Sequence, residues 1–284
     1  MHQVDCLFPS VDSWVILSSL EQSIKNKIEA VGTPLREWDI NIYRGVLTGY
    51  NDAFIIDSAK KEEILLNCKT EEERLRTTEL IRPILRGRDI KRYSYDWAGL
   101  WLINTHNGVK GRLSPIDIND YPSVKQYLDL HWEKIKKRED KGITPYNLRN
   151  CAYMDDFNKP KIVWIELSDE AKFTICEELI PLNTVFFITG EKLYNILGML
   201  NAKITKWYFT HCLGTTSGVG TNRWLKYTIE QLPLIYNMDE QFESIVKSIL
   251  SKPTIDLEKK IDKILYQAYN LSNEEIDFIE SFTQ

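Results

Sequence analysis

The sequence lacks the cysteine spacings that form disulfide frameworks or zinc sites. Its five cysteines, at positions 6, 68, 151, 176 and 212, include no C-x-x-C pair. An odd and scattered set of this kind is typical of reduced thiols in an intracellular protein. The chain also has no basic start followed by an apolar stretch, and no apolar run near the roughly 18 residues of a membrane span. We therefore expect a cytoplasmic protein with no membrane partner.

Catalytic motifs are also missing. No G-x-S-x-G elbow, Walker loop, H-E-x-x-H or G-x-G-x-x-G run occurs. One alternative is a PD-(D/E)xK nuclease, in which Asp156 and Glu170 would bind Mg²⁺ and Lys172 would polarise the attacking water. The segment SDEAK, which contains Glu170 and Lys172, is more typical of a solvated turn between two strands. We therefore predict no catalytic and no metal-binding residue in this chain.

The chain as a whole lacks positive charge, with 36 Lys and Arg against 41 Asp and Glu. The charge is unevenly distributed, however. Residues 237–284 hold five Lys against ten Asp and Glu, whereas residues 82–149 hold fourteen Lys and Arg against eight Asp and Glu. The acidity therefore lies in the tail, and the basic middle of the chain is where a polyanion could bind.

The remaining composition is that of a globular protein, with 43% hydrophobic and 27% charged residues over 284 positions. Helical periodicity predicts helices over 18–32, 122–139 and 191–209 and in the tail, where a Ser272–Glu275 capping box opens the last one. Ser18 or Ser19 can cap the first helix, with Glu21 or Gln22 as its capping-box partner, and Gly32 offers a left-handed stop. Short apolar runs predict paired strands at 39–44 and 52–57, a second pair at 91–97 and 99–105, and three more at 161–167, 172–177 and 184–189.

These elements predict an α+β fold of short, mixed or antiparallel strands with packed helices. We expect residues 1–236 to form the main domain. Residues 237–284 would form a helical segment that packs on that domain or on a catalytic domain.

The segment IRPILRGRDIKRY, residues 81–93, contains five cationic side chains. Pro83 and Gly87 make a continuous helix improbable, and Gly87 permits a tight backbone turn that separates its neighbours. An arginine can bond a phosphate or the edge of guanine through two parallel hydrogen bonds. Structural ion pairs are an equally good explanation, since Asp89 can hold one of these arginines in place. The candidate polyanion contacts in this segment are Arg86, Arg88, Lys91 and Arg92.

Two glycine-rich segments add candidates. In YRGVLTGYNDAF, Gly45 and Gly49 allow close backbone approach, and an asparagine side chain can pair with adenine through two hydrogen bonds. In GTTSGVGTNRW, polar side chains could follow a nucleic-acid backbone. Both segments are also rich in ordinary turn formers. The candidate contacts in the two segments are Arg44, Thr48, Tyr50, Asn51, Thr215, Thr216, Asn222 and Arg223.

The order of these segments resembles a known family. IYRGVLTGYNDAFIID, IRPILRGRDIKRY and GLWLIN, followed by LGMLNAKITKWYF, YTIEQLPL and IDKILYQAYNLSNEEIDFIE, are similar to the C-terminal specificity (target recognition) domain of TaqI-like and type IIG adenine-specific DNA methyltransferases. The resemblance runs from about Trp14 to Glu280. One departure is ITPYNLRN, where the family more often has W-x-x-L-R.

The resemblance implies a module that recognises a short sequence in double-stranded DNA and presents an adenine to a methyltransferase domain. The N-P-P-Y motif and the glycine motif of that catalytic half do not occur in this sequence. S-adenosylmethionine and Mg²⁺ are therefore expected only in catalytic domains outside this chain, which should not methylate or cleave DNA alone. The partner methyltransferase, with or without a nuclease domain, would lie on the same polypeptide or on a separate subunit, as in type I systems.

Overall fold

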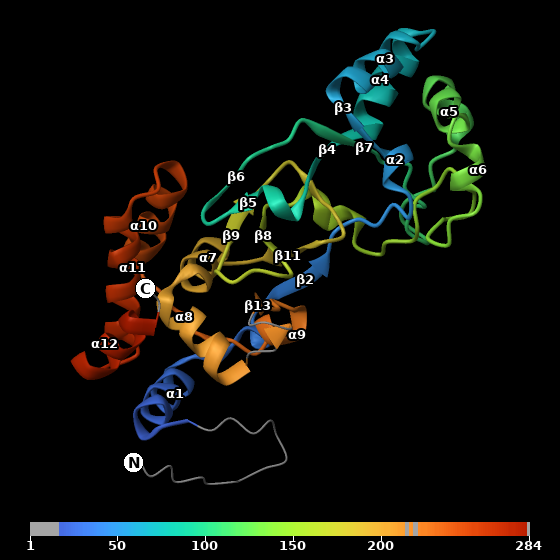
Figure 1. Cartoon of the computed structure of the whole chain (residues 1–284). Coiled ribbons are helices and arrows are strands. Elements are labelled where there is room, and N and C mark those ends of the chain that lie inside the picture. Colours follow the sequence, from blue (N-terminus) through green and yellow to red (C-terminus); the bar gives the residue numbers. More distant parts are fainter. Residues whose placement is uncertain (1–16, 214–215, 218–220, 283–284) are drawn as a thin grey trace.

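Two four-stranded sheets form the centre of the computed structural model, which describes residues 17–213, 216–217 and 221–282 (Figure 1). The first sheet is antiparallel throughout, in the order β2 (Ile40–Arg44), β11 (Val185–Gly190), β8 (Lys161–Ile165) and β9 (Phe173–Cys176). The second has the order β10 (Ile180–Pro181), β4 (Ile81–Leu85), β7 (Leu100–Ile103) and β3 (Ile55–Asp57), and only the β10–β4 pair is parallel. With the surrounding helices, these sheets confirm the predicted α+β class.

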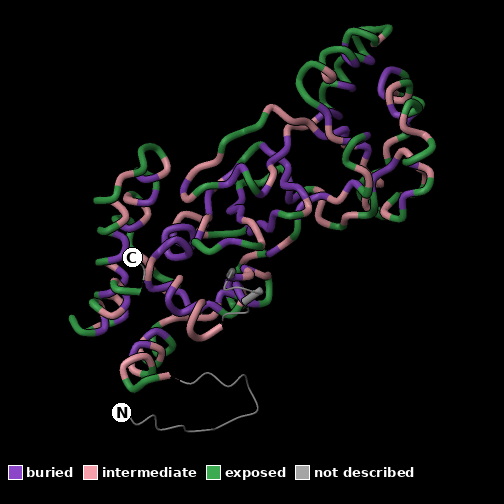
Figure 2. Tube along the Cα trace, viewed as in Figure 1, coloured by how far each residue is buried: buried purple, intermediate pink, exposed green. Residues whose placement is uncertain are grey.

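The first sheet is buried on both faces, because alternate side chains of its inner strands enter two different hydrophobic cores. In β8, Ile162 and Trp164 belong to one core and Val163 to the other. In β11, Ile188 and Phe187 divide in the same way. Figure 2 shows this concentration of buried residues along the central strands. The three strands predicted at 161–167, 172–177 and 184–189 are thus confirmed as β8, β9 and β11.

One core lies between the first sheet and a set of helices. These are α1 (Ser19–Val31), α7 (Leu193–Asn201), α8 (Lys203–Tyr208), α10 (Glu240–Ser251), α11 (Ile255–Ala268) and α12 (Asn273–Phe282). The tail helix α10 packs against α7 and α11, and a Cβ added to Gly198 of α7 would lie 2.6 Å from Val246 of α10. The tail therefore packs closely on this core. The division of the chain at residue 237 into two domains stays a prediction.

The other core lies around the second sheet, in the lobe at the upper right of Figure 1. It is surrounded by α2 (Asn51–Phe54), α3 (Ser58–Leu66), α4 (Glu71–Leu80), α5 (Pro122–Asp129), α6 (Trp132–Ile135) and the 3₁₀ segment η4 (Met154–Asn158). None of the helices in the described part of the chain has the length and apolar character needed to cross a membrane.

The predicted helix caps are confirmed at both ends of the chain. Ser18 and Glu21 form a reciprocal capping box at the start of α1, and Ser272 and Glu275 form another at the start of α12. The left-handed stop predicted at Gly32 is wrong, because this residue is extended (φ −78°, ψ 147°). A glycine fits there for a different reason: an added Cβ would lie 2.4 Å from the carbonyl oxygen of Pro233.

Four other expectations about elements are corrected. The segments at 39–44 and 52–57 do not pair, because residues 51–54 form a helical turn and β2 and β3 lie in different sheets. Likewise β7 pairs with β3 and β4, while β5 (Ile90–Lys91) pairs with β6 (Ser94–Tyr95) in a separate ribbon. The helix predicted at 122–139 ends at Asp129 and restarts at Trp132, and that at 191–209 is interrupted at Ala202, which is extended.

Candidate nucleic-acid interface

The loop between β2 and α2, together with the residue at each end of it, contains four of the predicted contact residues, Arg44, Thr48, Tyr50 and Asn51. It begins in close contact with another backbone, since a Cβ on Gly45 would lie 2.2 Å from the carbonyl oxygen of Leu182. Thr48 is only 1% exposed, and its hydroxyl donates a 2.6 Å hydrogen bond to Oδ1 of Asn51. Asn51 is exposed, and its Nδ2 has no hydrogen-bond partner among the described residues. Thr48 thus orients an amide whose donor group remains available to a ligand.

Tyr50 precedes Asn51 and is half-buried. Its ring lies edge-on to the ring of His131, with centroids 6.2 Å apart. His131 also meets the ring of Tyr127 at 5.2 Å. The break between α5 and α6 therefore lies against this loop and supports Tyr50 from one side.

A buried arginine, Arg138, fixes the backbone of this loop, and the sequence analysis did not select it. It is 6% exposed and donates four hydrogen bonds to backbone carbonyl oxygens, those of Thr48, Asp140, Pro145 and Asn147. Its guanidinium carbon lies 4.4 Å from the centre of the Phe54 ring, within range of a cation–π interaction. Burial lowers the pKa of Arg138 to about 10, so the side chain is still protonated at neutral pH.

The Arg138 contacts join two loops that are distant in sequence, residues 45–51 and residues 138–147. The second loop is fixed in turn by Asn147, which is 1% exposed and donates a 2.8 Å hydrogen bond to the carbonyl of Ile116. The position of Asn51 therefore depends on hydrogen bonds that join three chain segments: residues 45–51, residues 138–147 and Ile116. We call these joined segments the Arg138 framework. No single segment carries a sequence signal for this framework, because all the acceptors are backbone atoms.

The basic segment of residues 81–93 divides into paired and unpaired arginines. Arg86 donates two 2.8 Å hydrogen bonds to the carboxylate of Asp89, which raises the pKa of the guanidinium, and this confirms that Asp89 holds one arginine of the segment in place. Arg88 is exposed, and its side chain has no ion pair or hydrogen bond within the described residues. Gly87 between them packs on β8, since an added Cβ would lie 2.8 Å from Ile165. Arg88 is thus the arginine of this turn that is available to a ligand.

Glu166, directly after β8, brings together two arginines that the sequence places far apart. Its Oε1 lies 2.6 Å from Arg223, and its Oε2 lies 3.5 Å from Arg44. Arg44 also donates a 2.5 Å hydrogen bond to the carbonyl of Asn183. Both arginine side chains remain about half exposed, at 53% for Arg44 and 43% for Arg223. Arg88 lies near the same point, because it follows Gly87, which packs on Ile165 at the end of β8. Three arginines, Arg44, Arg88 and Arg223, therefore lie around the end of β8.

The other candidates lie elsewhere. Lys91 pairs with Asp96 within the β5–β6 ribbon, and Arg92 pairs with Glu258 of α11 at 2.5 Å, so Arg92 faces the tail helices. Asn222 is 5% exposed and pairs in register with Thr216 in the two-stranded ribbon of β12 (Thr216–Ser217) and β13 (Thr221–Asn222). Thr215 lies outside the described residues.

The residues of the alternative nuclease site are not arranged as a metal site. The carboxylate of Asp156 accepts hydrogen bonds from Lys159 at 2.7 Å and Thr189 at 3.1 Å. Glu170 and Lys172 pair with each other at 3.4 Å in the turn between β8 and β9, as the solvated-turn interpretation predicts. Within residues 17–213, 216–217 and 221–282 there is no group of three His, Cys, Asp or Glu residues that could hold a metal ion.

Comparison with known proteins identifies a family for the chain from the basic segment onward, and residues 44–51 lie outside that match. The model of the TaqI-like C-terminal specificity domain matches residues 82–234, which is just over half of the chain. The chain belongs to this family. The match begins at Arg82 of the basic segment and ends at Leu234 of β14 (Pro233–Leu234).

A curated relative and two solved structures agree with the family match. The chain is 23% identical, over 96% of its own length, to the type II methyltransferase M.BstVI of Geobacillus stearothermophilus, and it spans 47% of that relative. Its fold is similar to part of the type IIL restriction-modification enzyme MmeI, solved in complex with DNA (TM-score 0.59, 14% identity, 88% of this chain and 36% of that one). It is also similar to part of the type IIG restriction endonuclease BpuSI (TM-score 0.58, 15% identity, 92% of this chain and 31% of that one).

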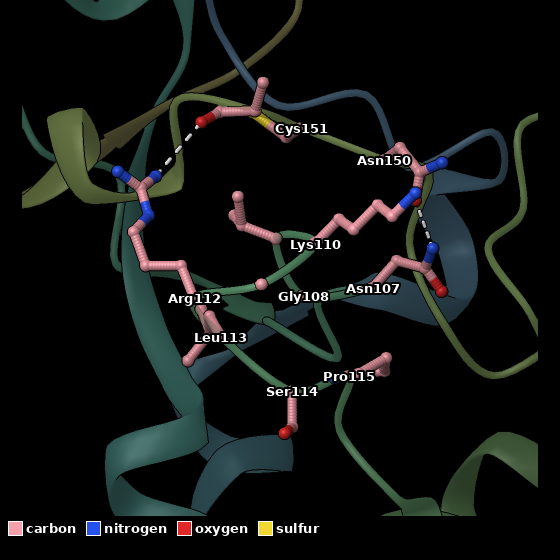
Figure 3. A pocket seen from close by; sticks show the side chains of 12 residues that line it. Asn107, Gly108, Lys110, Arg112, Leu113, Ser114, Pro115, Asn150 and Cys151 are labelled. Carbon is pink, nitrogen blue, oxygen red and sulfur yellow. Dashed lines mark hydrogen bonds between the residues drawn. The ribbon is translucent and has the colours of Figure 1, made fainter.

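The specificity domain also contains a cavity that sequence reasoning did not identify. It has a volume of about 770 Å³ and lies between residues 107–115 and residues 150–152 (Figure 3). Lys110 and Arg112 line it from one loop, and the side chains of Asn107 and Asn150 are hydrogen-bonded to each other near Lys110, across the cavity from Arg112. The only signal in the sequence was the two cations around Gly111, in a stretch with no family motif.

Proposed function

We propose that this domain recognises a short sequence of double-stranded DNA on behalf of an adenine-specific methyltransferase of the type IIG restriction-modification class. The domain would bind the duplex, fix the position of the site and present the target adenine to a catalytic domain. Chemistry on a base requires that the base leave the stack, so the adenine would be extruded into that other domain.

The observation that carries this proposal is the supported amide of Asn51, in a segment that resembles the R-G-x-x-T-G-x-N run of the family. An asparagine reads adenine by accepting from N6 and donating to N7. Here Thr48 holds Oδ1 and leaves Nδ2 available, and Arg138 fixes the backbone of the same loop. A side chain that is oriented before binding loses less entropy when it pairs with a base.

Phosphate contacts would come from the cations around the end of β8. Arg44 and Arg223 share one carboxylate, that of Glu166, so the three groups together have a net charge of one positive unit. Arg88 adds another. Such contacts set the position of a protein on the duplex and make affinity fall with salt, but they carry no sequence information.

The partner in this proposal is a methyltransferase domain, with or without a nuclease domain, on the same polypeptide or on a separate subunit. S-adenosylmethionine and Mg²⁺ would bind to those domains, because the sequence holds neither the N-P-P-Y motif nor the glycine motif of the catalytic half. The chain spans about half of its curated relative, which leaves room in such an enzyme for the catalytic part.

The test is a selection from a library of random duplexes with the purified domain, followed by sequencing of the bound fraction. We expect a short consensus that contains adenine, and we expect Asn51→Ala to lose the preference at one position while retaining affinity for unrelated duplexes. Binding of all duplexes without a consensus, or no binding at low salt, would refute the proposal. If the variant loses affinity uniformly, Asn51 does not read a base.

A further inference from the structure

Two neighbouring cavities lie beside the Arg138 framework, because Ile116, which accepts a hydrogen bond from Asn147, lines one of them. The first is the cavity of about 770 Å³ between residues 107–115 and 150–152. The second, of about 250 Å³, has Arg76, Arg82 and His106 in its walls. Leu113 lines both, so the two cavities are neighbours that share a wall. We call the two cavities together the 107–115 groove.

The 107–115 groove is electropositive in a chain whose net charge is −5. Among the residues that line it, four are cationic, namely Arg76, Arg82, Lys110 and Arg112. Only two are carboxylates, Glu79 and Asp155. Burial lowers the pKa of His106, so this side chain adds no charge near neutral pH. An excess of cations in a concave surface attracts a polyanion more strongly than the same charges on a convex one.

The outer wall of the groove is a small hairpin with both cations near its tip. Val109 and Leu113 pair as an isolated bridge, and Gly111 between them has φ +78° with open space around it. Residues 110–115 are all exposed. Lys110 has no ion pair or hydrogen bond from its side chain within the part of the chain that the structure describes. Arg112 pairs with Asp155 at 3.0 Å, and both side chains are more than half exposed.

The inner wall of the groove is fixed by side-chain amides. Nδ2 of Asn107 donates to Oδ1 of Asn150, and Oδ1 of Asn107 accepts a 2.7 Å hydrogen bond from the backbone of Ile143. Both Oδ1 and Nδ2 of Asn107 therefore already have hydrogen-bond partners within the protein. Unlike Asn51, Asn107 is not available to pair with the edge of a base. The cations of the groove are long side chains of the kind that contact phosphates. Arg112 and Arg76 each also donate a 3.3 Å hydrogen bond to a backbone carbonyl, that of Ala152 and that of Asp120, respectively.

We propose that the 107–115 groove is a second DNA-contact site of this domain and that it binds the phosphodiester backbone. The inference rests on the proposed function and extends it, because neither Lys110, Arg112, Arg76 nor Arg82 is among the contacts expected from the family segments. Backbone contact there adds affinity and salt dependence without sequence preference. The groove and the Asn51 loop are joined through Asn147 and Arg138, so both would contact the same duplex with fixed spacing.

The experiment measures the affinity of the domain for its selected duplex over a range of salt concentrations. Each phosphate contact contributes about 0.9 to the slope of log K against log salt on B-DNA. We expect Lys110→Ala/Arg112→Ala to reduce the magnitude of the slope by about 2 and to weaken binding to matched and unrelated duplexes by the same factor. The consensus sequence should not change. Because both residues are exposed, the thermal unfolding midpoint should stay close to that of the wild type.

The matched control is Lys247→Ala/Lys260→Ala, which removes two exposed lysines from α10 and α11, on the opposite side of the molecule (Figure 1). It should leave the slope unchanged. A wild-type slope and affinity in Lys110→Ala/Arg112→Ala would overturn the inference while leaving the proposed function intact. A changed consensus would show that the groove reads bases and would overturn its assignment to the backbone. If the wild-type domain binds no duplex, the proposed function itself fails.

Discussion

Replacing Arg138 with methionine should both destabilise the domain and weaken its preference for one DNA sequence over others. The variant keeps the volume of the side chain's stem but removes the donors to four backbone carbonyls. The carbonyl of Asn147 retains another donor, the backbone N–H of Gly142 at 2.9 Å. The carbonyls of Thr48, Asp140 and Pro145 have no second donor in the described part of the chain, so one buried acceptor, that of Thr48, and two partly buried ones would lose their partner.

Each unsatisfied buried acceptor costs about 1–3 kcal/mol, and relief from burying a charge offsets part of the total. We therefore expect a loss of about 2–4 kcal/mol in the free energy of unfolding, which is large against the roughly 5–15 kcal/mol of a typical domain. Urea unfolding followed by tryptophan fluorescence would measure it. Arg138→Lys should recover only part of the loss, because one ammonium group cannot reach carbonyls from three chain segments.

The control is Arg149→Met. Arg149 pairs with Asp140 in the same loop at 3.1 Å, but its side chain is 52% exposed. An exposed pair of this kind contributes about 1 kcal/mol or less, so this variant should unfold nearly as the wild type does. Below its unfolding transition, Arg138→Met should bind DNA with a weaker preference at the position that depends on Asn51. A loss below about 1 kcal/mol, or a folded variant with unchanged preference, would refute the role assigned to Arg138.

Three further predictions concern single charged groups. Arg88→Ala should reduce the salt slope of DNA binding by about 1 with little effect on stability. Arg86→Ala should mainly lower the free energy of unfolding, by about 1–2 kcal/mol. A changed salt slope in Arg86→Ala with a loss of stability in Arg88→Ala would contradict the roles assigned to these arginines. Glu166→Gln removes the shared carboxylate and should raise affinity for any duplex at low salt, and weaker binding would speak against phosphates at the end of β8. Burial raises the pKa of Asp262 to about 6 in the folded state, above its value in the unfolded chain. The folded state therefore holds this proton more tightly than the unfolded state does. The free energy of unfolding should fall as pH rises from about 4 to 6. Asp262→Asn should flatten that fall in urea unfolding measured at several pH values, and an unchanged pH profile would show that another group causes it.

Local signals in the sequence predicted local structure well. The capping boxes at Ser18 and Ser272 follow from residues three positions apart, and the three strands from 161 to 189 follow from short apolar runs. The link between Arg86 and Asp89 is equally local and was also predictable. In each case the partners lie within one turn or one strand, so chain geometry alone brings them together.

The arrangement of the candidate interface could not be predicted in the same way. The Arg138–Thr48 contact spans 90 residues, and its acceptor is a backbone atom that has no side-chain identity. Arg44 and Arg223 meet only through Glu166, which lies 122 and 57 residues away from them, respectively. The family resemblance identified the segments, but only the fold shows that Thr48 is buried beneath Asn51 and that Arg92 faces the tail.

The most direct test of the account is the affinity of the wild-type and Asn51→Ala domains for a set of duplexes that differ from the selected sequence at one base pair each. Each substitution within the consensus should weaken wild-type binding by about 1–3 kcal/mol, and Asn51→Ala should remove this penalty at one A·T pair and retain it elsewhere. Equal wild-type affinity for all members of the set would contradict the claim that this domain recognises a DNA sequence.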